Sequence, residues 1–374
     1  MSEFIISCGG TGGHLSPGIA LAEGLAAKGH GATLLISHKR VDARLVEKYP
    51  HLRFVRIPGS PFMLRPAGLA RFLVSQTRGF FFSLKLVRSL RPAGIVGFGG
   101  FTTAAIIVAG KLCGVPVALH EANRVPGRAI RLLGRLARRV YLPPGVSLSG
   151  VAAEVVRHVG LPVRKEIVRQ PQADARRRLG LEPSQKVLAI FGGSQGATTL
   201  NDWARREWPL LAAGGIQLYC VTGPGKGEGE VVEAKSRHGA PVKAIFIPFC
   251  DQVADLLSAA DLVVGRAGAG SIAEFIRCGT PAIVVPYPHA ADNHQWANAV
   301  YFAREGGGIV VDQEDVTGLS REVIGLILND GLLQECQAGL RRMDRASPLD
   351  LILTDLEQLT SAAGASRRAG ATVA

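Results

Sequence analysis

Three glycine-rich turns in the sequence have the composition of phosphate-binding loops. Residues 9–13 read Gly-Gly-Thr-Gly-Gly and residues 192–196 read Gly-Gly-Ser-Gln-Gly; each follows an apolar run and precedes a helical pattern. Residues 265–271 form a third such turn after the apolar run 262–264. Glycine lets the backbone approach a ligand closely, and the unpaired N–H groups of the following helix attract phosphate. The turns favour a phosphorylated ligand, and the alternative is that their glycines only permit tight strand-to-helix connections.

Neither of the first two turns carries a familiar nucleotide fingerprint. They do not fit the GxGxxG of dinucleotide-binding enzymes, and the chain contains no GxxxxGK[ST] of a P-loop. This disfavours NAD-dependent dehydrogenases and P-loop ATPases. After the third turn comes Glu274, which we place in the first turn of a helix that ends at residues 278–281. There its carboxylate would be stabilised by the helix dipole or would accept hydrogen bonds from a ribose.

The elements that must position these turns alternate along the whole chain. Runs rich in Val, Ile and Leu, separated by helical patterns, indicate βαβ units and parallel sheets covered on both faces. Because strand, glycine turn and helix recur half a chain apart, we expect an α/β fold of two doubly wound domains joined near residues 160–164. The predicted strands are Phe4–Cys8, Thr33–Ile36, Ile95–Gly97, Val115–Leu119, Val187–Phe191, Gln217–Val221, Ala244–Ile247, Leu262–Val264 and Ala282–Val285.

The excess positive charge of this 374-residue chain lies entirely in its first half. Residues 1–160 hold 21 basic and 6 acidic side chains, whereas residues 161–374 hold 22 and 24. Between Glu47 and Glu121 there are ten Lys or Arg and no acidic residue. Such a surface attracts an anionic partner: nucleic acid, a phosphorylated substrate or an anionic lipid.

Cysteine usage and the absence of targeting patterns indicate a reducing compartment. The six cysteines are scattered without a CxxC pair, which argues against a disulfide framework or a zinc site. The N-terminal run Phe4–Ile6 does not resemble a signal peptide. Residues 92–110 are uncharged and near the length of a membrane span. Because four glycines interrupt them, we interpret them as a strand, a glycine turn and a helix.

Residues 62–91 combine apolar and basic side chains without an acid. This composition suits an element that lies on an anionic membrane surface, where each cation contributes about 1 kcal/mol. The alternative is an ordinary amphipathic helix packed on the sheet with solvated arginines. The side chains that we predict to contact the membrane are Phe72, Phe80, Phe81, Phe82, Arg78, Lys85 and Arg88.

Six motifs in order along the chain resemble the MurG family. They are GGTGGHLSPGIALAEGL (9–25), HEAN (120–123), GLPVR (160–164), FGGSQGA (191–197), RAGAGSIAE (266–274) and PYPHAADNHQWANA (286–299). The resemblance runs from about residue 3 to 345. It implies the GT-B glycosyltransferase fold, two Rossmann-like domains facing a cleft. The first would comprise residues 1–161, completed by a C-terminal helix within 345–362, and would serve the acceptor and membrane side; the second, residues 162–344, would serve the donor.

The resemblance also implies a reaction. The 4-hydroxyl of MurNAc in undecaprenyl-diphospho-MurNAc-pentapeptide (lipid I) would attack the anomeric carbon of UDP-GlcNAc with inversion, releasing UDP and forming lipid II for peptidoglycan synthesis. UDP-GlcNAc is the donor substrate, and the sequence calls for no further cofactor and no metal. The enzyme would be peripheral on the cytoplasmic face of the inner membrane, bind no nucleic acid, and meet proteins of cell-wall or division complexes.

Matched residue by residue, the family motifs imply a donor site for UDP-GlcNAc. Arg164 would stabilise the departing diphosphate, with an exposed linker arginine as the alternative. Cys250 would lie beside the uracil, with a plain core cysteine as the alternative. The remaining donor contacts would be Thr11, Gly12, Gly13, Asn123, Ser194, Ala269, Gly270, Ser271, Glu274 and Gln295, with Asn293 and Asn298 as weaker matches.

His14 is the candidate catalytic base. It follows the first glycine turn at the start of a helix, where the dipole would favour the neutral imidazole that a base needs. The alternative is a histidine that only hydrogen-bonds substrate or loop. Glu121 is a secondary candidate that could instead order its loop, and His120 and His294 are further ones. The chain departs from the family pattern at Ala122, Leu161 and Gly270-Ser271, which puts the detailed contacts there in doubt.

Two other classes remain open from the residues alone. A UDP-GlcNAc 2-epimerase would share the two-domain architecture and the donor, but it would leave the basic apolar stretch without a role. A basic nucleic-acid-binding protein would use the charge, but it would leave the three glycine turns unexplained.

Overall fold

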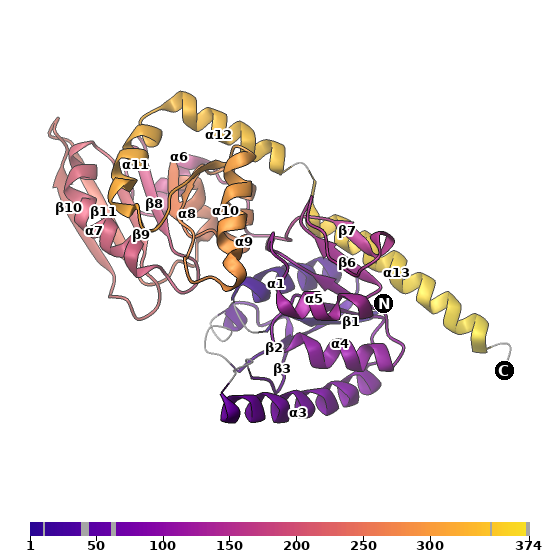
Figure 1. The fold of residues 1–374 in the computed structure, drawn as a ribbon. Helices are drawn as coiled ribbons and strands as arrows, with labels where there is room; N and C mark the ends of the chain where they lie inside the picture. The colour runs from indigo at the N-terminus through magenta and orange to yellow at the C-terminus, as the bar shows by residue number, and fades with distance from the viewer. Residues whose placement is uncertain (10–11, 39–44, 61–64, 345, 372–374) are drawn as a thin grey trace. The chain divides into compact units, whose positions relative to one another are not determined.

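The computed structural model describes residues 1–9, 12–38, 45–60, 65–344 and 346–371 (Figure 1). The chain forms two compact units, Met1–Arg164 with Ala346–Ala374, and Lys165–Arg345. The division follows Arg164, three residues beyond the predicted boundary. Arg164 is buried, and its guanidinium donates to the hydroxyl of Tyr49 in the first unit over 3.2 Å.

The first unit is built on a seven-stranded parallel sheet with the order β3-β2-β1-β4-β5-β6-β7. Its strands are β1 (Glu3–Ser7), β2 (Gly31–Ile36), β3 (Arg53–Arg56), β4 (Gly94–Gly97), β5 (Val117–His120), β6 (Arg139–Leu142) and β7 (Val156–His158). Its helices are α1 (Gly12–Ala27), α3 (Pro66–Leu90), α4 (Thr103–Leu112), α5 (Arg128–Leu133), η1 (Gly134–Leu136), η2 (Ala153–Val155) and α13 (Pro348–Ala371).

Successive side chains along each strand point to opposite faces of this sheet, so they contribute to two hydrophobic layers. Phe4 and Ile6 of β1 pack with α1 and α13 on one face, whereas Ile5 packs with α3, α4 and α5 on the other. Helix α13 is also tied to the sheet by Asp355, which accepts hydrogen bonds from Arg139 and from the hydroxyl of Tyr141. Burial and Asp355 together raise the pKa of Tyr141, so this phenol stays protonated and can donate.

The second unit repeats the design with the strand order β10-β11-β9-β8-β12-β13-β14. Its strands are β8 (Val187–Phe191), β9 (Gln217–Val221), β10 (Glu230–Lys235), β11 (Pro241–Ile247), β12 (Leu262–Gly265), β13 (Ala282–Val284) and β14 (Gly308–Val310), all parallel except the edge strand β10. Its helices are α6 (Gln172–Arg178), α7 (Thr198–Ala213), α8 (Val253–Ala259), α9 (Ala269–Cys278), η3 (Ala291–Asn293), α10 (His294–Arg304), η4 (Val316–Gly318), α11 (Leu319–Ile327) and α12 (Asp330–Met343). Two largely parallel sheets covered by helices confirm the predicted α/β class.

Candidate active site

Gly9, after β1, and the start of α1 lie at the topological switch point of the first sheet. Strands β1 and β4 are neighbours, and from them the chain proceeds to opposite edges of the sheet. In open α/β sheets, ligands bind at this point, beyond the carboxyl ends of the strands. The loop after β1 leads into α1, and the loop after β4 contains Gly99 and Gly100. The fold therefore places His14, the third residue of α1, where a ligand is expected.

Gly99 and Gly100 give His14 the room it occupies. Both have positive φ, and a Cβ on Gly100 would lie 3.3 Å from Nδ1 of His14 and 2.9 Å from the carbonyl oxygen of Gly9. Thr102, which is buried, donates its hydroxyl to that same carbonyl over 3.1 Å. The loop after β4 is thus hydrogen-bonded to Gly9 after β1, and its glycines border the half-buried imidazole of His14. The sequence analysis did not predict this contact between the loop after β4 and His14. Its only signal was the pair of glycines after a predicted strand.

His120 ends β5 and is the buried neighbour of this site. Its ring is 1% exposed and packs against Phe98 and Tyr141. Nε2 lies 3.1 Å from the carbonyl oxygen of Gly160, so it must carry the proton, while Nδ1 has no hydrogen-bond partner among the described residues. Burial, outweighing the bond to Gly160 and assisted by repulsion from His14, lowers the pKa of His120 to about 4. His120 is therefore a neutral tether between β5 and the segment at residue 160.

This burial predicts a pH dependence of stability. The unfolded chain takes up the proton near pH 6.5 and the folded chain only near pH 4, so stability is lost as pH falls through that window. At about 1.4 kcal/mol per pKa unit, His120 contributes a loss of about 3 kcal/mol in the free energy of unfolding. Denaturant unfolding between pH 7 and pH 4 should show this loss in the native protein and lack it in His120→Gln. The same change at exposed His158 should preserve the loss; a native-like pH profile in His120→Gln would contradict the assignment.

Glu121 orders the loop that follows β5. Its buried carboxylate accepts hydrogen bonds from the backbone N–H of Asn123 at 2.8 Å, from the Asn123 side chain at 3.1 Å, and from the N–H of Gly127 at 2.7 Å. These bonds fold residues 121–127 around one carboxylate. The geometry supports the loop-ordering role that the sequence left open for Glu121, and it fixes the position of Asn123.

Arg164 closes the first unit as a buried side chain. Only 8% of it is exposed, so the alternative of an exposed linker arginine is wrong. Thr11 lies outside the described residues, as do Phe62 and Met63 of the basic stretch. Gly12 is the first residue of α1, and Gly13 follows it with its backbone exposed.

The second glycine turn lies at the switch point of the second sheet, between β8 and β12. A Cβ on Gly192 would lie 2.4 Å from the backbone nitrogen of Ala197, and one on Gly196 would lie 2.0 Å from the carbonyl oxygen of Thr222. Only glycine fits this tight turn. Ser194 stands exposed at its tip, and the Cβ position of Gly193 faces the hydroxyl of Ser271 at 3.9 Å. The second and third glycine turns thus lie side by side.

Helix α9 presents an open N-terminus at this switch point. It starts at Ala269 after Gly268, which offers no side-chain cap. A Cβ added at Gly268 or Gly270 would meet no atom within 4 Å. Glu274 is the sixth residue of α9, so its predicted place in the first turn is wrong, because the helix begins within the glycine turn itself. The first N–H groups of a helix have no acceptor within it, and the open space at the Cβ positions of Gly268 and Gly270 leaves room for a phosphate beside them.

Arg266 links this turn to the loop after β13, a role that sequence reasoning missed although it stands in the RAGAGSIAE motif. Its guanidinium donates to the carbonyls of Val285 and Pro286 at 3.1 and 3.2 Å and to Gln313 at 2.6 Å. Burial lowers its pKa, because desolvation disfavours the charged guanidinium. Asn298 is also buried and donates to the carbonyl of Ala267 at 3.1 Å. Both side chains shape the loops.

Three further predicted site residues, Gln295, His294 and Cys250, belong to the second unit. Gln295 of α10 accepts the N–H of Tyr287 at 2.9 Å through its carbonyl oxygen, which directs its amide nitrogen away from that bond. His294 places Nδ1 2.7 Å from the carbonyl of Ala291 and so closes the η3 turn. Cys250 follows the carboxyl end of β11 and is 7% exposed.

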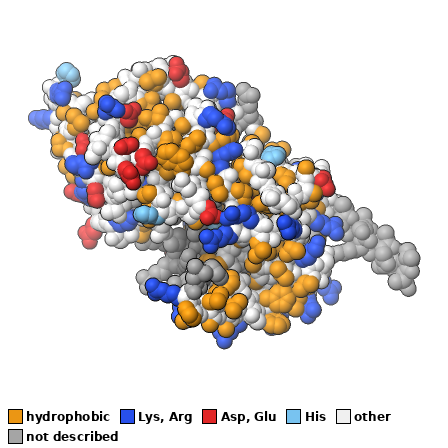
Figure 2. Space-filling view, viewed as in Figure 1, with side chains coloured by type: hydrophobic (Ala, Val, Ile, Leu, Met, Phe, Trp, Pro, Cys, Tyr) orange, Lys and Arg blue, Asp and Glu red, His pale blue; other side chains and the backbone are white. Residues whose placement is uncertain are grey.

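Most of the basic stretch forms helix α3, which has one face buried against the sheet layer and one face exposed. Gly79, Ser83 and Val87 are buried against the sheet layer, and Phe80 and Phe82 pack against the same core as half-buried side chains. Phe72 is also half-buried. The exposed stripe, at helical spacing, consists of Val74, Arg78, Phe81, Lys85 and Arg88, with Leu69 and Leu73 beside it. Of the four predicted phenylalanines only Phe81, 63% exposed, stands fully on the surface. In the view of Figure 2, orange and blue side chains without red cover the region of α3 and α4.

The described residues offer neither a membrane-spanning helix nor a cluster of metal ligands. No helix among them is long and apolar enough to cross a membrane. No group of three or more His, Cys, Asp or Glu side chains in the described ranges is placed to hold a metal ion.

Comparison with known proteins decides the family. The glycosyltransferase family 28 N-terminal domain matches residues 4–142, and the family 28 C-terminal domain matches residues 187–345. The UDP-N-acetylglucosamine--N-acetylmuramyl-(pentapeptide) pyrophosphoryl-undecaprenol N-acetylglucosamine transferase of Opitutus terrae is 60% identical over 374 residues, 100% of this chain and 99% of that one. The chain belongs to the MurG family.

Other MurG relatives agree. The transferase of the same name from Prochlorococcus marinus is 35% identical over 343 residues, 89% of this chain and 90% of that protein. The crystal structure of Acinetobacter baumannii MurG superposes with a TM-score of 0.72 at 23% identity, covering 95% of this chain and 99% of that one. The structural likeness confirms the predicted GT-B class, and the relatives confirm the predicted MurG resemblance.

Proposed function

We propose that this enzyme transfers N-acetylglucosamine from UDP-GlcNAc to the 4-hydroxyl of MurNAc in lipid I, with inversion, to form lipid II. The observation that carries the proposal is the 60% identity to a transferase of that name over the full length of both chains. The relatives compared above are all such transferases, so neither the epimerase nor the nucleic-acid-binding alternative gains support from them. Product analysis separates these classes, because an epimerase would convert UDP-GlcNAc to UDP-N-acetylmannosamine without any acceptor.

The second unit is the proposed donor side. The diphosphate of UDP-GlcNAc would lie at the open N-terminus of α9, where the N–H groups of Ala269, Gly270 and Ser271 offer donors and the helix dipole favours negative charge. Exposed Ser194 lies in the adjacent turn and supports the same placement. Glu274 would bind the ribose one helical turn further along α9. Gln295 would use its amide nitrogen for the sugar, and Cys250 would border the uracil.

The first unit is the proposed acceptor side. His14 would remove the proton of the acceptor hydroxyl as that oxygen attacks the anomeric carbon. The negative charge then grows on the UDP leaving group, which helix N-terminal donors stabilise without a proton transfer. Arg164 would assist the diphosphate after giving up its bond to Tyr49. Thr11, Gly12, Gly13 and Asn123 would contribute the first-unit contacts to the donor.

We further propose that α3 docks the first unit on the cytoplasmic face of the membrane, where the lipid acceptor resides. The support is the exposed stripe of α3, which joins apolar Val74 and Phe81 to three cations without an acid. An anionic surface attracts the cations while the apolar groups enter the headgroup region. Contacts with cell-wall or division proteins remain a prediction of the family resemblance.

Charge reversal tests this docking. The triple variant Arg78→Glu, Lys85→Glu, Arg88→Glu should bind anionic vesicles at least about 100-fold more weakly, since each cation contributes about 1 kcal/mol. A vesicle sedimentation assay measures this, and turnover on a short-chain soluble acceptor should survive. The matched control reverses Lys48, Arg53 and Arg56, which lie in or before β3 at the sheet edge. Equal binding by the α3 variant and the native protein would refute the docking.

A further inference from the structure

Arg266 joins three loops at the carboxyl edge of the second sheet. It follows β12, and β13 and β14 are the next strands in the sheet. Its guanidinium donates to the carbonyls of Val285 and Pro286, just after β13, and to Oε1 of Gln313, in the loop after β14. The side chain therefore crosses the end of β13 and reaches the loop beyond it.

Gln313 makes the shortest of these hydrogen bonds. Its Oε1 lies 2.6 Å from Nη2 of Arg266, whereas the two carbonyls lie at 3.1 and 3.2 Å. The backbone of Gln313 is held in a turn that the N–H of Asp315 closes on the carbonyl of Asp312. Arg266 is buried, and among the described residues only neutral acceptors hold it. Without Gln313 a buried N–H would lose its acceptor, so the guanidinium would shift towards water.

Arg266 and Gln295 hold the two ends of one peptide unit. The carbonyl of Pro286 and the N–H of Tyr287 belong to the same peptide bond. Arg266 donates to that carbonyl, and Oε1 of Gln295 accepts that N–H over 2.9 Å. Because a peptide unit is planar, a shift of its carbonyl end also turns its N–H end. A cation at the carbonyl polarises the unit and strengthens the N–H as a donor.

This peptide unit decides which end of the Gln295 amide is available to a ligand. Because the amide oxygen accepts the N–H of Tyr287, the two N–H groups of the amide point away from that bond. The side chain is half-buried, and no described residue accepts a hydrogen bond from its nitrogen. That nitrogen is the atom that the proposed contact with the sugar of UDP-GlcNAc would use.

We propose that Gln313 is a positioning residue for the sugar of the donor. It holds Arg266, which holds the peptide unit before Tyr287, and that unit aims the amide nitrogen of Gln295. The inference rests on the proposed function, because it takes Gln295 as the contact to the sugar. Gln313 itself acts only through this series of hydrogen bonds.

The proposed diphosphate site has a support of its own. Asn298 donates to the carbonyl of Ala267, in the turn before α9, at 3.1 Å. The N–H of Val285 donates to the carbonyl of Gly265 at 2.8 Å and ties the same turn to the end of β13. Neither bond involves Gln313. Loss of Gln313 should therefore weaken the sugar contact and leave the affinity for UDP unchanged.

A double-mutant cycle tests the coupling of Gln313 to Gln295. Calorimetric titration gives the Kd of UDP-GlcNAc and of UDP for Gln313→Ala, Gln295→Ala and the double variant. Loss of one neutral hydrogen bond to the sugar should weaken UDP-GlcNAc binding about fivefold in Gln295→Ala and about threefold in Gln313→Ala, with native affinity for UDP. The double variant should lose no more than Gln295→Ala, because both changes remove the same contact. Gln313→Glu keeps the acceptor and should keep the native ratio of the two affinities.

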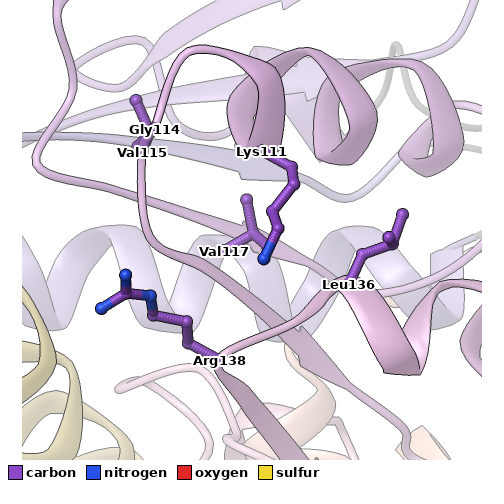
Figure 3. A pocket seen from close by; sticks show the side chains of 6 residues that line it. All are labelled: Lys111, Gly114, Val115, Val117, Leu136 and Arg138. Atoms are coloured by element: carbon purple, nitrogen blue, oxygen red, sulfur yellow. The ribbon is translucent and has the colours of Figure 1, made fainter.

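Two control variants should bind both ligands like the native protein. Gln185→Ala removes another glutamine hydrogen bond of the second unit, from Nε2 of Gln185 to the carbonyl of Pro241 at 2.8 Å, before the amino end of β8. Lys111→Gln changes a side chain of the first unit, which lines a cavity of about 120 Å³ (Figure 3). A loss of affinity that Gln313→Ala shares with these controls would overturn the positioning role.

The cycle can also contradict the proposal directly. A double variant about 15-fold weaker than the native protein would mean that Gln313 does not act through Gln295. Equal losses for UDP and UDP-GlcNAc in Gln313→Ala would assign Gln313 to the fold of the second unit. Native binding of UDP-GlcNAc by either single variant would remove the sugar contact from this series of bonds. Failure of the native enzyme to transfer the sugar to lipid I would contradict the proposed function instead, and the binding cycle would still decide the coupling.

Discussion

Replacing His14 with alanine should lower turnover at saturating concentrations of both substrates by about 10²- to 10⁴-fold, the usual contribution of a positioned base. The imidazole lies at the switch point of the first sheet, walled by Gly99 and Gly100, and the acceptor hydroxyl must lose its proton as it attacks. Removing the base leaves that proton to water. Initial-rate measurements at saturating UDP-GlcNAc and a lipid I analogue give kcat directly.

The control for His14 is alanine at His158, an exposed histidine at the end of β7 that should leave kcat unchanged. Near-normal turnover with a raised KM for the acceptor would assign His14 to binding and leave the base to another group.

Replacing Gly270 with valine should weaken donor binding without unfolding the protein. A Cβ at Gly270 meets no atom within 4 Å outside its own helix, so we expect the fold to tolerate valine there, beside the first N–H groups of α9. Loss of two hydrogen bonds from backbone N–H groups to a charged diphosphate, about 1.5–3 kcal/mol each, weakens binding about 100-fold or more. Calorimetric titration with UDP measures this loss, and the KM for UDP-GlcNAc should rise in parallel.

Gly325→Val is the matched control, because Gly325 also lies in a helix, α11, with open space at its Cβ position. Both variants should unfold at nearly the native temperature. Native affinity for UDP in Gly270→Val, or equal losses in the two variants, would show that the diphosphate does not lie at α9.

The sequence predicted most of the strands whose side chains are buried on both faces, although β6, buried from Val140 to Leu142, is an exception. Runs such as Val187–Phe191 and Leu262–Val264 are apolar throughout because helices cover both sides of the sheet. It missed β3, β6, β7, β10 and β14. These strands are short or carry charged residues, as in the Arg53–Arg56 strand and the exposed Glu230–Lys235 edge. Their conformation depends on pairing with a neighbour, which local composition does not report.

The candidate site was predictable where backbone geometry demands glycine. The turn at residues 192–196 is visible in sequence because the backbone leaves no room for a Cβ at Gly192 or Gly196, and the turn at 265–271 has the same constraint at Gly265. The contacts that support the site were not. Thr102 bonds a carbonyl 93 positions away and Arg266 reaches Val285, so only the folded chain brings them together. The composition of residues 62–91 predicted a membrane contact. Which phenylalanine is exposed depends on the rotation of α3 against the sheet, which composition does not report.

Transfer to the lipid acceptor is measured by supplying radiolabelled UDP-GlcNAc with a lipid I analogue and separating the lipid products. We expect label to enter the lipid fraction as a GlcNAc–MurNAc disaccharide only when that acceptor is present, with one UDP released per transfer. Label that stays in the nucleotide sugar with acceptor present, or that appears as UDP-N-acetylmannosamine without it, would contradict the account.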